Sequence, residues 1–166
     1  MILLRQKQLS VGKRHMRSIG QNGFTLVELM VTIAVMGIIA VMAAPSFGNM
    51  LNKQNLNRST SELVAVLSKA RSQAAIERRT ITVSIGQGVD TDNVFFWSPY
   101  GKSNLKVGSN IIFMPNGLVR DPNTNTVIGR DTTFVICENG SESTLSKTII
   151  VSRMGAIQQP ITGDCT

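Results

Sequence analysis

The feature that most constrains this chain is a run, residues 29–52, that carries no charged side chain. Its most apolar part extends from Leu29 to Ala44. A helix rises about 1.5 Å per residue, so about 20 residues cross the hydrocarbon core of a bilayer. The run is therefore long enough to span a membrane as one helix. Pro45 interrupts it, and we expect a kink there because proline removes one backbone hydrogen bond.

The charges around this run predict its orientation. Residues 1–23 contain Lys and Arg but no Asp or Glu, and by the positive-inside rule they stay in the cytoplasm. Everything after the run is then on the other side of the membrane. The whole chain has a formal net charge of +7, and most of that surplus lies in residues 1–23. The remainder is close to neutral, which argues against a surface built mainly to bind nucleic acid.

Composition also excludes most enzyme classes. The only histidine is His15, inside the basic segment, and the chain has two cysteines. Histidine triads, histidine general bases and zinc clusters are therefore excluded once that segment is removed. No carboxylate pair has a diagnostic spacing, and no glycine-rich phosphate loop follows a predicted strand. We expect a protein that is not an enzyme and that needs no cofactor or metal.

Glu28 stands at the start of the apolar run. A lone carboxylate costs about 2.5–3.5 kcal/mol near the centre of a membrane helix and less near its end, where the helix dipole offsets part of the cost. An acid in such a place is a functional-site hypothesis that needs a named partner. Cleavage between Gly23 and Phe24 would supply a free amino group four residues before Glu28. The alternative is a signal-anchor helix that is never cut.

The residues around this position are similar to a known motif. Gly23-Phe24-Thr25-Leu26-Val27-Glu28, between a basic segment and an apolar run, resembles the leader motif of type IV prepilins. The resemblance implies that a prepilin peptidase removes residues 1–23 and methylates the new amino group of Phe24. It also implies that Glu28 pairs with the Phe24 amino group of a neighbouring subunit during assembly. The implied partners are other pilin or pseudopilin subunits, the peptidase and, before assembly, the bacterial inner membrane.

Helical patterning continues beyond Pro45. Apolar residues fall mostly at steps of three or four along one face: Phe47, Leu51, Leu63, Leu67, Ala70 and Ala74. This predicts one helix from about Thr25 to Arg79, apolar all round in its first half and amphipathic in its second. The predicted organisation is a cleaved leader (1–23), a membrane or filament-core half-helix (24–52) and a periplasmic head with the amphipathic half-helix (53–166).

After Arg79 the pattern becomes strand-like. Strands are predicted at 80–85, 94–97, 111–114, 132–136 and 148–152, with a last hairpin strand at 156–158. Pro115-Asn116-Gly117 is a turn signal, and 118–130 is predicted to be a polar surface loop. The fold class is α+β: a long N-terminal helix packed on a small, mainly antiparallel sheet head.

Cys137 and Cys165 are 28 positions apart in a compartment that the topology predicts to be oxidising. A disulfide between them would stabilise the head by about 3–4 kcal/mol in the chain-entropy model. The alternative is two free buried thiols.

The head resembles the GspH/FimT group of minor pilins and pseudopilins. The resemblance rests on Ala70-Arg71-Ser72-Gln73-Ala74-Ala75, on Phe113-Met114-Pro115-Asn116-Gly117 and on Ile149-Ile150-Val151-Ser152-Arg153-Met154-Gly155. It implies a minor subunit of a type IV pilus or of a type II secretion pseudopilus, which share these features. DNA-binding members of the group carry Gly-Arg-x-Arg in the last hairpin, where this chain has Gly155-Ala156-Ile157-Gln158. The difference favours a FimU-like minor pilin.

Capture of DNA for transformation is the alternative function. The candidate contacts to DNA or other anions are Arg71, Arg78, Arg79 and Arg153. The cations near the end of the predicted helix also have a simpler interpretation, since positive charge complements the helix dipole there. Nucleic acid is therefore a partner that we do not favour.

Overall fold

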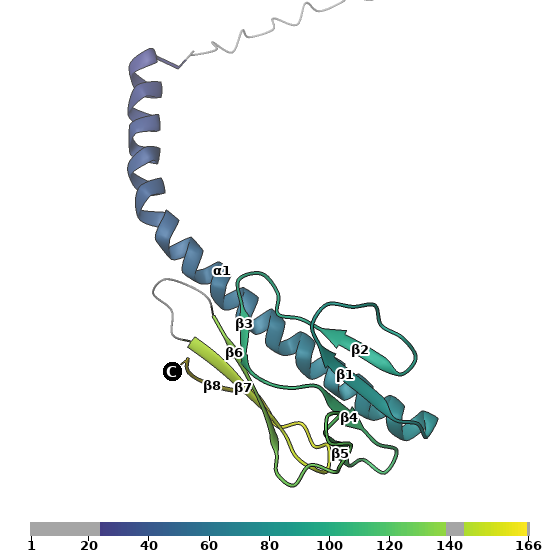
Figure 1. Cartoon of the computed structure of the whole chain (residues 1–166). Helices are drawn as coiled ribbons and strands as arrows, with labels where there is room; N and C mark the ends of the chain where they lie inside the picture. The colour runs from purple at the N-terminus through teal and green to yellow at the C-terminus, as the bar shows by residue number, and fades with distance from the viewer. Residues whose placement is uncertain (1–23, 139–144, 166) are drawn as a thin grey trace, which may run out of the picture. The chain divides into compact units, whose positions relative to one another are not determined.

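The computed structural model describes residues 24–138 and 145–165, with the backbone alone at Pro45. The predicted leader and Gly23 lie outside the described residues. One long helix, α1, extends over Leu26–Glu77, two residues shorter at its C-terminal end than the predicted helix (Figure 1). It ends where Arg78 adopts a left-handed conformation with φ of 51°, a conformation that often follows the last helical residue.

The head contains two four-stranded sheets. The first has the strand order β2-β1-β4-β5, and β1 pairs parallel with β2 and antiparallel with β4. Its strands are β1 (Ile81–Ile85), β2 (Val94–Trp97), β4 (Ile111–Phe113) and β5 (Val119–Arg120). Gly117, with φ of 84°, lies in the predicted turn between β4 and β5, where the Gly117 amide donates to the carbonyl of Met114 at 2.9 Å.

The second sheet has the strand order β3-β6-β7-β8, and all its pairs are antiparallel. Its strands are β3 (Asn104–Val107), β6 (Thr132–Cys137), β7 (Leu145–Val151) and β8 (Ile161–Asp164). Both sheets lie beside the second half of α1 in Figure 1. The α+β fold, with mainly antiparallel pairing, is confirmed.

One hydrophobic core joins the helix to both sheets. On α1 the buried apolar residues repeat at steps of three, four or seven: Leu56, Leu63, Leu67, Ala70 and Ala74. The first sheet contributes Ile81, Val83, Phe95, Trp97, Ile111, Phe113 and Val119, and the second contributes Phe134, Ile136, Ile149 and Val151. Small Ala70 and Ala74 let the strands approach the helix closely, because a large side chain there would hold the layers apart.

The first two residues of the predicted apolar stripe lie in the predicted half-helix 24–52 and do not pack on the head. Phe47 is 63% exposed and Leu51 is 45% exposed, whereas Leu56 is buried. The reason is physical: the strands begin to cover α1 only from about Leu56 onward. Periodicity alone does not tell where along a helix the packing partner begins.

The strand predictions need correction at four places. Residues 156–158 form no strand and make only a single bridge between Ile157 and Val151. The last strand is β8, which was not predicted, and neither was β3. The predicted loop 118–130 begins with the two-residue strand β5. These strands carry few buried side chains, so they lack the apolar alternation from which a strand is recognised.

The first part of α1 differs from the rest. The chain divides into two units, one ending at Ala40 and the other beginning at Val41 and containing the head. By length and composition α1 could cross a membrane, with a mean hydropathy of 2.5 in its most apolar stretch. No part of that stretch is buried within the protein. The backbone is helical through Pro45, and the kink expected there remains a prediction.

Candidate functional site

The N-terminal end of α1 is closed by Thr25. The amide of Glu28 donates a hydrogen bond to the Thr25 hydroxyl oxygen at 3.2 Å, and the Leu29 amide donates to the Thr25 carbonyl. Thr25 is therefore the N-cap of the helix, and Glu28 occupies the third helical position, the spacing of a capping box. The sequence analysis missed this signal, a threonine three residues before a glutamate and an apolar run. Glu28 thus has a local reason to lie near the helix N-terminus.

The cap leaves the Glu28 carboxylate unpaired. Glu28 is exposed, and no ion pair in the described part of the chain involves it. Its neighbours along the helix are exposed apolar side chains, among them Leu26 and Leu29. Phe24, the predicted new N-terminus, is 80% exposed. Glu28 is available for a cation supplied from outside the described residues.

An apolar surface follows Glu28 along the helix. From Leu26 to Leu51 its exposed large side chains include Met30, Val31, Ile33, Val35, Met36, Ile38, Ile39, Val41, Met42, Phe47 and Met50. Water-exposed apolar surface on this scale is unfavourable, at roughly 25 cal/mol per Å². A helix that is apolar on every side is stable in a membrane or inside a bundle of other helices.

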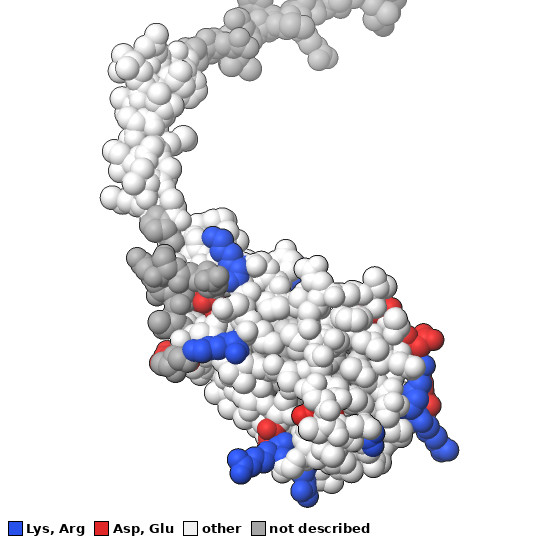
Figure 2. Space-filling model, in the orientation of Figure 1, with Lys and Arg blue, Asp and Glu red and all other residues white. Residues whose placement is uncertain are grey.

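The predicted basic residues do not form one stripe. Arg79 forms an ion pair with Glu77, and Arg78 is in the left-handed turn that ends α1. Arg71 and Arg153 are exposed. On the face shown in Figure 2, Lys and Arg lie in separate places around the rim of the head, with a largely uncharged middle. A continuous basic surface that could follow a nucleic-acid backbone is not seen on that face.

Three motifs on which the GspH/FimT resemblance rests come together in space. Gly155, with φ of 73°, lies where an added Cβ would be 2.6 Å from the Gly117 carbonyl oxygen and 3.3 Å from Nε of Arg71. The amide of Val119 donates to the carbonyl of Arg153 at 2.9 Å. The turn after β7 thus packs against the β4–β5 turn and next to α1. These residues act together as a structural corner of the head.

A loop not singled out from sequence holds α1 at the other end of the core. The Tyr100 amide donates to the Ser59 hydroxyl at 2.8 Å, and the Arg58 guanidinium lies 3.7 Å from the centre of the Tyr100 ring. Arg58 also donates to Glu62 at 2.8 Å, and this hydrogen bond raises the pKa of Arg58 above its ordinary value. Only the fold reveals this contact, because Ser59 and Tyr100 are 41 positions apart.

Cys137 and Cys165 form the predicted disulfide, with a Cα–Cα distance of 5.8 Å. Cys137 ends β6, and Cys165 directly follows β8. The bond therefore ties together two strands that flank β7.

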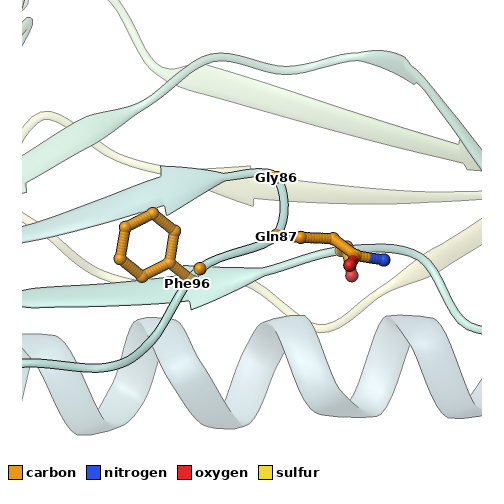
Figure 3. A pocket seen from close by; sticks show the side chains of 5 residues that line it. Gly86, Gln87 and Phe96 are labelled. Atoms are coloured by element: carbon orange, nitrogen blue, oxygen red, sulfur yellow. The ribbon is translucent and has the colours of Figure 1, made fainter.

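A small cavity of about 200 Å³ lies beside the loop that follows β1 (Figure 3). It is lined by Gly86, Gln87, Gly88, Phe96 and Ser98. Figure 3 shows the Gln87 side chain extending away from the Phe96 ring. No acid, base or thiol lines the cavity, so it offers no catalytic group, and the described residues hold no cluster of His, Cys, Asp and Glu suited to a metal.

The arrangement defines a class: an exposed apolar helix with one unpaired carboxylate at its start, continuous with a disulfide-bonded α+β head. Comparison with known proteins identifies the motif. Residues 19–44 match the prokaryotic N-terminal methylation motif. This confirms the predicted similarity to type IV pilins in the leader and at the start of α1.

The relatives are pilins and fimbrial proteins. The chain is 33% identical over 93 residues to a type IV major alpha-pilin of Moraxella bovis, covering 55% of this chain and 56% of the relative. It is 30% identical over 94 residues to a fimbrial protein of Pseudomonas aeruginosa, covering 54% and 61%. A type IV major fimbrial protein, FimA, of Dichelobacter nodosus is 43% identical over 42 residues, 25% of this chain and 27% of the relative.

The matched segments span only about half the length of the first two relatives. The chain is thus similar to type IV pilins, which are structural proteins, and this agrees with the expectation that it is not an enzyme. Two of these three relatives are named major pilins or major fimbrial proteins, and none is named a minor pilin. The resemblance to the GspH/FimT group therefore rests on the motifs in the head alone.

Proposed function

We propose that this chain is a minor, pilin-type structural subunit that is anchored in the bacterial inner membrane and then assembled into a filament. The filament is a type IV pilus or the related type II secretion pseudopilus. The observation that carries the proposal is the apolar surface of α1 between Leu26 and Leu51, exposed on all sides with a single unpaired carboxylate at its start.

Processing is the first step of the proposal. A prepilin peptidase cuts between Gly23 and Phe24 on the cytoplasmic side and methylates the Phe24 amino group. The match of residues 19–44 to the methylation motif supports this step. The Thr25 cap keeps Phe24 outside the helix and close to its first turn, so a new amine there would lie beside the helix start.

Anchoring and assembly then use the same surface twice. Before assembly, the apolar half of α1 lies in the membrane, with residues 1–23 in the cytoplasm and the head in the periplasm. During assembly, that half packs among the helices of other subunits. The amino group of Phe24 of one subunit neutralises Glu28 of its neighbour, which sets the axial position of each new subunit.

The minor role is supported by the head. The three motifs of the GspH/FimT resemblance pack against one another around Gly155 and Gly117, so they form one structural unit. The oxidising periplasm is consistent with the disulfide between Cys137 and Cys165.

Replacement of Glu28 tests the proposal. The variant Glu28→Ala should insert in the membrane and fold with a wild-type head, because Glu28 is exposed and is not part of the hydrophobic core of the head, but its recovery in sheared filaments should fall about tenfold or more. Thr25→Ala is the matched control, since it removes the cap and keeps the carboxylate. Normal recovery of Glu28→Ala in filaments would contradict the pairing of Glu28 with a neighbour.

DNA capture is the second candidate function, and one observation favours it. Arg71 lies beside the turn that contains Gly155, and Arg153 precedes Gly155 by two residues. A gel-shift titration of the full chain in detergent across a salt series tests it. Binding that weakens steeply with salt and disappears in an Arg71→Ala, Arg153→Ala variant would support DNA capture. Binding that is absent at low salt would exclude it.

A further inference from the structure

A groove lies on α1 directly after its most apolar stretch. Its volume is about 470 Å³, which is within the range of small-molecule binding sites. The groove belongs wholly to the unit of the structure that begins at Val41. The helical residues that line it are all exposed: Ser46, Asn49, Met50, Lys53, Gln54 and Asn57.

The groove carries a positive charge that the protein does not neutralise. Lys53 is its only charged residue. No ion pair in the described part of the chain involves Lys53, and α1 contains no acidic residue between Glu28 and Glu62. Glu62 itself pairs with Arg58 at 2.8 Å. The charge on Lys53 is therefore available to an anion from outside the protein.

The polar side chains around Lys53 are not explained by the stability of the helix. Residues 49–57 are rich in asparagine, which favours a helix less than alanine, leucine or lysine does. One of these asparagines, Asn55, packs against the loop at Gly101, where an added Cβ would be 2.6 Å from its Nδ2. By contrast, the amides of Asn49 and Asn57 line the groove and make no hydrogen bond among the described residues. They are free to donate to a ligand.

The position of the groove along the chain indicates its surroundings. The uncharged run 29–52 is longer than the about 20 residues that cross a hydrocarbon core, and Lys53 is the first charged residue after it. The end of the run and Lys53 therefore lie at the level of the lipid headgroups, where long lysine side chains at helix ends commonly extend. This conclusion depends on the number of residues along one helix, and not on the direction in which the head projects.

The groove is also amphipathic along its length. Met50 lies on the side of the apolar run, and Phe47 and Leu51 beside it are 63% and 45% exposed. Lys53 and Asn57 follow on the side of the head. A phospholipid has the same order, with acyl chains in the hydrocarbon core and a phosphate farther out. A nucleic acid fits less well, because one lysine cannot neutralise a row of phosphates.

We propose that this groove binds the headgroup of an anionic phospholipid in the membrane that anchors α1. Lys53 pairs with the lipid phosphate, and the amides of Asn49 and Asn57 donate hydrogen bonds to its oxygens. The inference rests on the proposed function, because it requires the apolar half of α1 to lie in a membrane.

The first test identifies the lipids that stay on the protein. The full chain is reconstituted in nanodiscs of phosphatidylcholine and phosphatidylglycerol, and native mass spectrometry identifies the lipids retained on release. The wild type should retain phosphatidylglycerol in preference. Lys53→Gln should lower that retention about fivefold, the effect of one lysine at a charged membrane surface, and Lys53→Arg should keep it.

Lys69→Gln is the matched control for Lys53→Gln. Lys69 is a lysine of the same helix, about 24 Å farther along it, and it lies near Asp90. Its replacement should leave phosphatidylglycerol retention within about twofold of wild type. Equal losses from the two variants, or a wild type without preference for phosphatidylglycerol, would overturn the proposal.

Asn57→Leu separates a binding groove from a general attraction between lysine and a charged surface. The variant removes one amide and leaves the charge unchanged, and leucine favours the helix more than asparagine does. Loss of a hydrogen bond to the headgroup should lower phosphatidylglycerol retention about threefold. Retention at the wild-type level would overturn the proposal, because Lys53 alone would then hold the lipid.

Crosslinking in the native membrane identifies the occupant. A photo-crosslinking phenylalanine derivative replaces Gln54, or Ile76 as the control, in the full chain before filament assembly. Ile76 is 79% exposed and lies about 33 Å farther along α1. The proposal predicts phospholipid adducts at position 54 and few at position 76. A polypeptide adduct at position 54 in place of lipid would overturn the proposal and would make the groove a protein interface.

The same membranes separate this proposal from the proposed function. Alkaline extraction and the mass of the chain are measured in parallel. A chain that begins at Phe24 and resists extraction, but retains no phosphatidylglycerol, contradicts the lipid site alone. A chain that alkali releases from the membrane contradicts the anchoring step of the proposed function itself.

Discussion

The two halves of α1 are built from similar apolar residues but have opposite surroundings. In the second half, Leu63 and Leu67 are fully buried beneath the strands. In the first half, Ile33 and Ile39 are 61% and 60% exposed. Burial of an apolar side chain in the head thus stabilises this molecule, whereas the same side chain in the first half can be covered only by lipid or by other chains. The helix combines a surface buried in the head and an exposed apolar surface in one element.

The largest expected difference between the halves is in stability. Leu67→Ala should destabilise the head by about 2–5 kcal/mol, because it leaves a cavity between α1 and both sheets. Ile33→Ala is the matched control and should leave head unfolding unchanged. Thermal unfolding of the full chain in detergent, followed by the near-ultraviolet signal of Trp97, measures both. Equal shifts in Tm for the two variants would contradict the claim that only the second half of α1 stabilises the head.

Loss of the disulfide should have the next largest effect. Cys165→Ser should lower the stability of the head by up to about 3–4 kcal/mol without changing membrane anchoring. β8 contributes no buried residue, so the loss should be concentrated in β8 and β7. Thermal unfolding gives the size of the effect, and hydrogen exchange gives its location. An unchanged Tm would remove the stabilising role of the disulfide.

A smaller effect is expected at the corner of the head. Gly155→Ala should cost about 1–3 kcal/mol, because the backbone has a positive φ and the new Cβ would meet the Gly117 carbonyl. Gly129→Ala, where an added Cβ meets no atom within 4 Å, is the control. Denaturant unfolding of the two variants measures the difference. Similar midpoints would contradict the close packing of the two turns.

The smallest effect concerns the exposed half alone. Thr25→Ala removes the N-cap, worth about 1 kcal/mol, and should speed amide exchange at Glu28 about fivefold. Exchange in the head strands should not change, because the cap is a local hydrogen bond between Thr25 and Glu28. Faster exchange in the head as well would mean that the two halves are energetically coupled.

The features readable from sequence were those with a strong local pattern. Three features carry such a pattern, and the structure confirms them: the apolar run, the helical spacing of apolar residues around Leu63 and Leu67, and the turn ending at Gly117. The spacing of Thr25 and Glu28 was also readable but was missed. By contrast, β3 and β8 are exposed and lack alternation, so no pattern marks them.

Other features depend on the three-dimensional arrangement. Phe47 and Leu51 are exposed because the strands begin to cover α1 only after these residues, and the sequence does not show where that cover begins. The contact of Tyr100 with Ser59, and that of Gly155 with Gly117, join segments that are distant in sequence. The proposed partner of Glu28, the Phe24 amino group of a neighbouring subunit, lies outside the single chain altogether.

Intact-mass measurement of the protein extracted from its native membrane tests the central claim most directly. The account predicts a chain that begins at Phe24 and is heavier by one methyl group, because an amine at that position is what makes Glu28 useful in an apolar environment. A chain that still begins at Met1 would contradict the account and would leave a membrane-tethered α+β head without a filament to join.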